Sequence, residues 1–83
     1  MTDQKLIKVR YFAALREQAG IDQEKVSTQA DTAEALYTEL KNKYNFSLDI
    51  KNLKLSYNLN FSDFNQVIHN GDELVFIPPV AGG

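Results

Sequence analysis

TAEALYTELKNKY, residues 32–44, decides the fold, because it is the stretch in which apolar side chains recur at the spacing of a long helix. The positions that share one face of that helix are Ala33, Leu36, Tyr37, Leu40 and Tyr44. Asp31, followed three residues later by Glu34, predicts an N-cap with a capping box. A helix with one apolar face has to bury that face against another element, and the flanking segments indicate a sheet.

Upstream of this helix, KLIKVRYF (residues 5–12) alternates apolar and polar side chains as a strand does, with Ile7, Val9 and Tyr11 on one face. AALREQA (13–19) has the composition of a short helix, and Gly20 predicts its end. EKVST (24–28) predicts a second strand that pairs with the first as a hairpin across this helical insertion.

Downstream, KNLKLSYNL (51–59) alternates again and predicts a third strand, after which Asn58, Asn60 and Asp63 indicate turns. Asn70-Gly71-Asp72 predicts a tight turn, and ELVFI (73–77) predicts the last strand. This order of elements predicts a single α+β domain. We expect a β-grasp (ubiquitin-like) mixed sheet with one main helix packed on one face and a flexible C-terminal Gly-Gly tail.

Length and composition exclude several classes of protein. Eighty-three residues make one small domain, without room for a deep enclosed active-site cleft. The absence of cysteine excludes disulfides, thiolate metal sites, cysteine nucleophiles and iron–sulfur clusters. The formal charge of −2, without a basic stripe, predicts no nucleic-acid or membrane partner and is compatible with a basic protein partner. The polar start and the lack of a long apolar run predict a cytoplasmic protein.

The last eight residues, FIPPVAGG (76–83), are the most informative for function. We place the β-grasp domain at residues 1–78 and an extended, reactive tail at residues 79–83. Two prolines stiffen the exit from the last strand, and five residues from Pro79 onward reach roughly 15 Å along a polyproline-like path. Glycine has no side chain, so the end of this tail can enter a narrow tunnel in another protein. The residues predicted to thread into that tunnel are Pro78, Pro79, Val80, Ala81 and Gly82.

The carboxylate of Gly83 is the predicted reactive group. A free carboxylate is a poor acyl donor until it is activated, for example as an acyl-adenylate formed with ATP. A sulfur nucleophile then gives a thiocarboxylate, whereas a lysine amine gives an isopeptide bond. The sequence has no GxxxxGK[ST] loop, so a separate enzyme has to supply the ATP chemistry.

FIPPVAGG after the NGDEL turn (70–74), together with VRYFAALREQAG (9–20), resembles the small, sulfur-carrier subunits of molybdopterin synthase, a group of ubiquitin-like sulfur carriers. KLSYNLNFSDFNQ (54–66) is only loosely similar to that family. The resemblance implies that an ATP-dependent activating enzyme adenylates Gly83 and that a sulfur donor converts it to a thiocarboxylate. The tail then gives its sulfur to the cyclic pterin precursor of the molybdenum cofactor.

The resemblance also implies which partners and cofactors this chain uses. The large synthase subunit supplies the catalytic side chains and assembles with this chain into a heterotetramer. This chain itself contributes no catalytic side chain, binds no cofactor and holds no metal. ATP is used by the activating enzyme.

One face of the predicted sheet has no helix to cover it. If Val9, Tyr11, Leu74 and Phe76 face the helix, then alternate side chains face outward. Because interface cores are enriched in aromatic residues and arginine, we predict a protein-docking surface there. Its predicted members are Arg10, Phe12, Arg16, Phe61, Val75 and Ile77. The alternative is that these side chains pack under loops or under the tail.

The remaining polar residues indicate no second site. His69 lacks a partner of metal-binding type and is predicted to be an exposed turn residue, and the adjacent Asp72 and Glu73 are predicted to point to opposite faces of a strand. Three other functions stay open from the sequence. They are a sulfur carrier for thiamin synthesis or tRNA thiolation, a ubiquitin-like modifier of lysines, and an interaction domain with an accidental Gly-Gly end.

Overall fold

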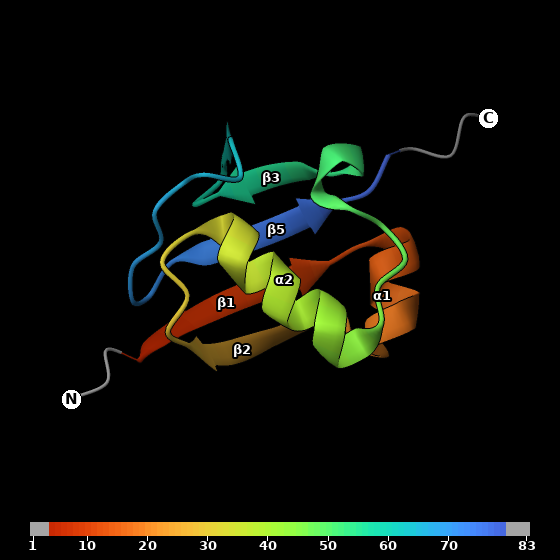
Figure 1. Ribbon diagram of the computed structural model, residues 1–83, viewed down its shortest axis with the longest axis horizontal. Helices are drawn as coiled ribbons and strands as arrows, with labels where there is room; N and C mark the ends of the chain where they lie inside the picture. The colour runs from red at the N-terminus through yellow and green to blue at the C-terminus, as the bar shows by residue number, and fades with distance from the viewer. Residues whose placement is uncertain (1–3, 80–83) are drawn as a thin grey trace.

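A five-stranded mixed sheet with a helix lying across one face makes up the body of the protein (Figure 1). The computed structural model describes residues 4–79. The elements are β1 (Lys5–Tyr11), α1 (Ala13–Ala19), β2 (Gln23–Thr28), α2 (Ala33–Tyr44), the short 3₁₀ helix η1 (Ile50–Asn52), β3 (Lys54–Tyr57), β4 (Asn60–Ser62) and β5 (Glu73–Ile77). The strand order is β2-β1-β5-β3-β4, with β1 and β5 parallel and the other neighbours antiparallel. The predicted β-grasp arrangement is confirmed.

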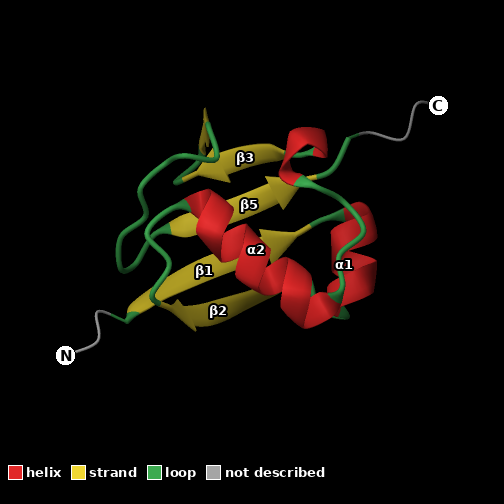
Figure 2. Ribbon diagram, in the orientation of Figure 1, coloured by secondary structure: helices red, strands yellow, loops and turns green. Residues whose placement is uncertain are grey.

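The helix α2 covers the sheet through the apolar face that the sequence predicts (Figure 2). Its buried side chains are Ala33, Leu36, Tyr37 and Leu40. The Tyr37 ring lies 5.1 Å from the Phe76 ring, centroid to centroid, and stacks on Phe46 at 5.8 Å. Each large apolar side chain buried in this layer contributes about 1.5–3 kcal/mol to folding. No helix within residues 4–79 is both long enough and apolar enough to cross a membrane.

The N-cap of α2 differs from the prediction. Thr32, and not Asp31, caps the helix, because its backbone is extended and its hydroxyl accepts a hydrogen bond from the Ala35 N–H at 3.2 Å. Glu34 is then one position too early for a capping box. The Asp31 carboxylate instead lies 3.6 Å from the Lys5 ammonium, and its backbone oxygen accepts a hydrogen bond from the Ile68 N–H. Where two good capping residues are adjacent, side-chain chemistry alone does not determine which of them is the N-cap.

The segment after α2 also differs from the prediction. The expected strand at residues 51–59 is shortened to β3, since residues 50–52 form η1 and residues 58 and 59 form a turn with positive φ angles of 48° and 75°. This turn joins β3 to β4, which occupies residues where the sequence indicated only turns. Leu59, predicted to be in phase with Leu55, is therefore 82% exposed at the tip of a hairpin.

The insertion between β1 and β2 follows the prediction. The two strands pair antiparallel, and α1 ends at Gly20, whose φ of 80° suits glycine. The Gly20 N–H donates to the Arg16 carbonyl at 2.9 Å and closes the last turn. This insertion holds Phe12 and Arg16 at the end of the sheet toward which β1 and β5 both run.

Candidate functional site

The strand β5 holds the exit point of the predicted tail. It lies between β1 and β3, and Leu74 and Phe76 are fully buried beneath α2. Pro78 is buried, and Pro79, the last described residue, is exposed. Val80, Ala81, Gly82 and the predicted reactive Gly83 lie outside the described residues.

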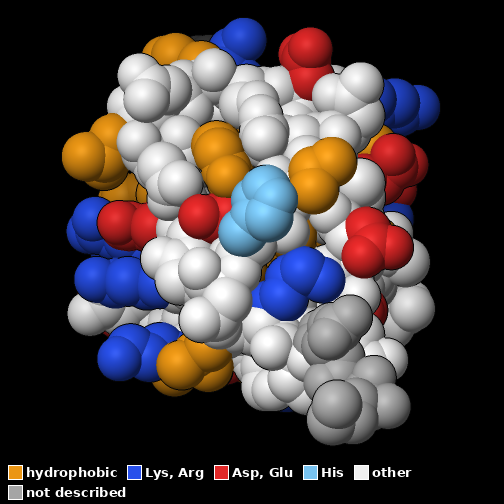
Figure 3. All heavy atoms as spheres, turned by 90° about the vertical axis from the view of Figure 1, so that its left-hand side faces the viewer, with side chains coloured by type: hydrophobic (Ala, Val, Ile, Leu, Met, Phe, Trp, Pro, Cys, Tyr) orange, Lys and Arg blue, Asp and Glu red, His pale blue; other side chains and the backbone are white. Residues whose placement is uncertain are grey.

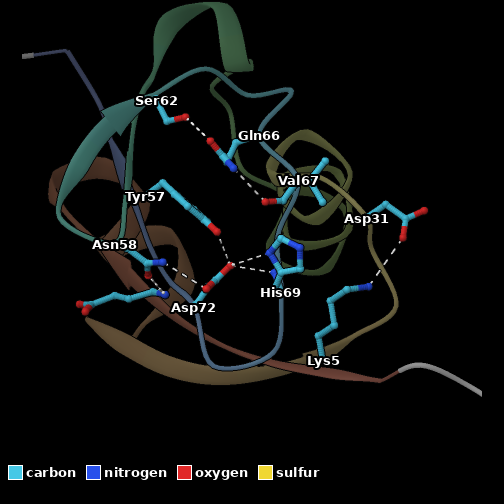
Figure 4. Close-up of polar contacts among 10 residues, drawn as sticks. Lys5, Asp31, Tyr57, Asn58, Ser62, Gln66, Val67, His69 and Asp72 are labelled. Atoms are coloured by element: carbon cyan, nitrogen blue, oxygen red, sulfur yellow. Dashed lines mark hydrogen bonds and ion pairs between the residues drawn. The ribbon is translucent and has the colours of Figure 1, made fainter.

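Asp72 fixes the other end of β5 (Figure 4). Its carboxylate accepts hydrogen bonds from the Tyr57 hydroxyl at 2.7 Å, the Asn58 amide at 3.1 Å and the His69 backbone N–H at 2.7 Å. Partial burial works to raise the pKa of Asp72, but these hydrogen bonds to the charged form prevail and lower it. The Asn58 side-chain oxygen also accepts the Glu73 N–H at 2.8 Å. The turn before β5 and the β3–β4 hairpin are thus joined through one carboxylate.

The face of the sheet opposite α2 carries the second part of the site, and we call it the open face. Side chains alternate across a strand, so residues adjacent to the buried ones in β1 and β5 point away from α2. The strand registers place Arg10 beside Val75, Val75 beside Ser56, and Ser56 beside Phe61. A second row runs from Lys25 to Lys8 to Glu73, and a third pairs Ile77 with Lys54.

Three of the predicted docking residues gather near the end of β1. The Arg10 guanidinium lies 5.8 Å from the centroid of the Phe12 ring and 3.8 Å from the Glu73 carboxylate. A small hollow of about 110 Å³ lies between Arg10, Phe12 and Arg16 and is also lined by Asp22. Phe12 is 42% exposed at this hollow and places an apolar ring beside the Arg10 guanidinium.

The other three predicted docking residues lie across the sheet. Val75 is only 8% exposed, Ile77 is half-buried beside it on β5, and Phe61 is 76% exposed on the edge strand β4. A shallow hollow separates Phe61 from Lys54 and Leu55 of β3. The structure therefore distributes the six residues along one surface and separates Phe61 from the Arg10 group by two strands.

Sequence reasoning missed the cations that share this surface. Lys25 and Lys54 were not among the predicted site residues, and neither was Lys8, although alternation in β1 places Lys8 on the same side as Arg10. Their proximity depends on which strands are neighbours and in which register. A single strand pattern does not contain that information.

The titratable side chains near the start of β5 are engaged in structural contacts or are exposed. Asp72 is held by three hydrogen bonds, Glu73 pairs with Arg10, and the His69 side chain is 70% exposed in its turn. Residues 4–79 hold no group of three or more His, Cys, Asp or Glu side chains that could bind a metal ion. The described geometry is that of a sheet face without a covering helix, beside a central strand that ends at a buried proline.

Comparisons with known proteins find similar sequences over nearly the whole chain. Residues 9–83 match the ThiS family. The chain is 33% identical over 81 residues to the molybdopterin synthase sulfur carrier subunit of Escherichia coli strain K12, covering 94% of this chain and all of that one. It is 35% identical over 88 residues to the subunit of the same description from Anopheles gambiae, covering 99% of this chain and 97% of that one.

Solved structures show the same fold. They include a putative molybdopterin converting factor, subunit 1, from Pyrococcus furiosus, with a TM-score of 0.76 at 24% identity over 92% of this chain and 99% of that one. A small archaeal modifier protein 1 from Methanosarcina acetivorans gives 0.76 at 24% identity over 96% and 98%. A complex of subunits 1 and 2 of the molybdopterin-converting factor from Helicobacter pylori gives 0.63 at 24% identity over 94% and 99%. At these identities the structural likeness establishes the fold alone, since carriers and a modifier share it.

Proposed function

The chain belongs to the ThiS family, and from that premise we propose that it is the sulfur carrier subunit of a molybdopterin synthase. The observation that carries the proposal is the sequence match along the whole length of the Escherichia coli subunit, at 33% identity. The match of similar extent to the Anopheles gambiae subunit supports the same function. The thiamin, tRNA-thiolation and modifier alternatives have no comparable support.

In the proposed reaction, the Gly83 carboxylate attacks ATP on an activating enzyme and forms an acyl-adenylate with release of pyrophosphate. A sulfur nucleophile from a donor then displaces AMP and leaves a thiocarboxylate. The sulfur passes to the cyclic pterin precursor on the large subunit. ATP acts only on the activating enzyme, so this chain needs no cofactor of its own.

The geometry of β5 supports a carrier role. A carrier has to present its terminal group at a fixed distance from a docked body. Pairing with strands on both sides and the burial of Leu74 and Phe76 fix the direction in which the chain leaves the sheet. Pro79 begins the exposed part with a restricted φ angle. We infer that residues 79–83 thread into the partner, with Pro78 as the buried root of that segment.

The large subunit is the proposed partner at the open face. The Helicobacter pylori structure is described as a complex of subunits 1 and 2, which supports such a pairing. We place Phe12, Val75 and Ile77 at the centre of the contact, with the other predicted docking residues, Arg10, Arg16 and Phe61, around them. A heterotetramer with the large subunit, a separate activating enzyme and a cytoplasmic location remain parts of this proposal.

Mass spectrometry of the C-terminal peptide tests the function. The chain is incubated with its activating enzyme, ATP and a sulfur source, and the peptide is separated from Met1, whose oxidation mimics the exchange of oxygen for sulfur. A thiocarboxylate at Gly83 is the expected product, and a chain lacking Gly83 is the matched control. A carboxylate left unmodified, while another carrier is loaded in the same mixture, contradicts the proposal. An isopeptide bond to lysine assigns the chain to the modifiers instead.

A further inference from the structure

The open face is basic although the chain is acidic. Its strands present four cations, Lys8, Arg10, Lys25 and Lys54, and one acid, Glu73. The full sequence has nine Lys or Arg and eleven Asp or Glu, so all other positions together carry five cations and ten acids. In Figure 3, where this face turns to the left, Lys and Arg side chains line the left edge of the molecule. The open face therefore carries an excess of cations, whereas the rest of the sequence carries an excess of acids.

The fold does not require this arrangement. Lys8 and Lys25 stand directly opposite each other on antiparallel strands, where like charges are unfavourable. Glu73 is the register neighbour of Lys8, but within residues 4–79 its carboxylate lies within ion-pair distance of Arg10 and not of Lys8 or Lys25. A partner that supplies further negative charge would relieve the repulsion that remains between the two lysines.

Cations lie on two sides of an apolar centre. Val75 and Ile77 lie on β5 in the middle of the sheet, and the Phe12 ring lies beside Arg10. Lys54 is the neighbour of Ile77 on β3. On the other side of β5, Lys8 lies two residues before Arg10 on β1, and Lys25 lies opposite Lys8 on β2. Interfaces combine an apolar centre with a polar rim and complementary charge. A partner surface complementary to this face therefore has an apolar centre and an acidic rim.

We propose that the open face docks a protein surface in which Asp and Glu side chains surround an apolar centre, and that the cations of the open face steer this encounter. The proposal rests on the function given above, under which the large synthase subunit bears that surface. This acidic partner surface is the opposite of the basic protein partner with which the overall charge of −2 is compatible.

Two other occupants fit the face less well. A second copy of this chain, docked symmetrically through the same face, would bring two sets of four cations together. A nucleic acid would meet Glu73 beside Val75 in the middle of the face, and the excess of acids on the rest of the chain would repel it.

The test compares two doubly charge-reversed variants with the same net charge. Lys8→Glu with Lys25→Glu changes the open face, whereas Lys43→Glu with Lys51→Glu changes α2 and the neighbouring η1. Association with the large subunit from the same organism is followed by stopped-flow fluorescence between about 0.01 M and 0.15 M ionic strength. Thermal unfolding of each variant checks the fold, and Lys8→Gln with Lys25→Gln serves as a milder variant of the open face.

We expect the open-face reversal to slow association by about 10-fold or more at low ionic strength, with a weaker salt dependence. The α2 reversal should change the rate by about 2-fold at most, because its charges lie away from the contact. Equal effects of the two reversals, or a wild-type rate that does not fall with salt, overturn the acidic partner surface while the carrier function stands. Tighter binding of a short single-stranded oligonucleotide than of the large subunit also overturns it. A wild-type chain that does not bind the large subunit at all overturns the proposed function and this inference with it.

Discussion

The two faces of the sheet are made from alternate residues of the same strands, yet they obey different constraints. On the covered face, Leu74 and Phe76 are fully buried against α2, and their size and shape are set by packing. On the open face, the neighbours Glu73, Val75 and Ile77 line a surface that also holds four cations. If the proposed partner docks on the open face, the even-numbered positions of β5 specify the fold and its odd-numbered positions specify the partner.

The most severe test of this comparison makes the same substitution on each face. Phe76→Ala removes a ring that stacks on Phe64 and meets Tyr37, and we expect it to lower the free energy of unfolding by about 3–5 kcal/mol. Phe61→Ala removes a ring that is 76% exposed, and we expect a change within about 0.5 kcal/mol. Urea denaturation measures both. If Phe61→Ala is as destabilising as Phe76→Ala, the open face is a packed face and the comparison fails.

The second test asks whether the apolar centre of the open face binds a partner. Ile77→Asp and Phe12→Asp each place a charge in the proposed contact, and we expect either to cost about 2 kcal/mol of binding to the large subunit, or ~30-fold in Kd. Isothermal titration calorimetry measures the affinity per folded molecule. Asn42→Asp introduces the same charge on the exposed side of α2 and should leave Kd unchanged. Unchanged affinity in both open-face variants would move the contact elsewhere.

A third test addresses the start of β5, where the two faces meet. The lowered pKa of Asp72 means that its stabilising effect is present above the pKa of about 3.9 that the group has when unfolded. That effect is lost as the pH falls through the folded pKa, which lies below that value. Asp72→Asn should cost about 1–3 kcal/mol at pH 7 and should flatten the loss of stability below pH ~4.

Denaturation curves between pH 7 and pH 3 compare this variant with Asp63→Asn, whose carboxyl lies in an exposed loop. A wild type and an Asp72→Asn variant that lose stability in parallel would show that Asp72 does not couple the β3–β4 hairpin to β5.

The smallest expected effect concerns a single pair of charges on the open face. Lys25→Glu turns the repulsive Lys8–Lys25 pair into an attractive one, and cross-strand pairs of this kind contribute about 0.2–1 kcal/mol. We expect a slightly more stable protein that nevertheless associates more slowly with the large subunit. Differential scanning calorimetry and the association rate together measure the two effects. A variant that gains both stability and association rate would contradict the role assigned to Lys25.

Much of this fold could be predicted from local patterns. The strand at residues 73–77 has the predicted bounds, and the strand at residues 5–11 and the helix at 33–44 differ from prediction by one residue each, because the repeats of their buried side chains are unambiguous. The errors fall where local chemistry has two solutions. Asp31 and Thr32 are both good capping residues, and tertiary contacts with Lys5 and Ile68 decide between them.

The hairpin at residues 54–62 shows a second limit. In the sequence, the alternation that places Leu55 in the core continues to Leu59, but two positive φ angles turn the chain there and expose that side chain. Likewise, the outward direction of Lys8 follows from β1 alone, whereas its opposition to Lys25 follows from the register of two strands. Sequence patterns therefore predict which side chains of one strand share a face better than which charges meet across neighbouring strands.

The parallel pairing of β1 and β5 has a mechanical consequence. The start of β1 and the end of β5 lie at opposite ends of the sheet, so a pull at Pro79 against the N-terminal side runs along both strands (Figure 1). The hydrogen bonds between them then bear the load in shear, several at a time, instead of peeling open one by one. β3 resists the same pull from the other side of β5. If residues 79–83 thread into the partner as proposed, the force on them is borne along the strands, the direction in which the sheet resists best.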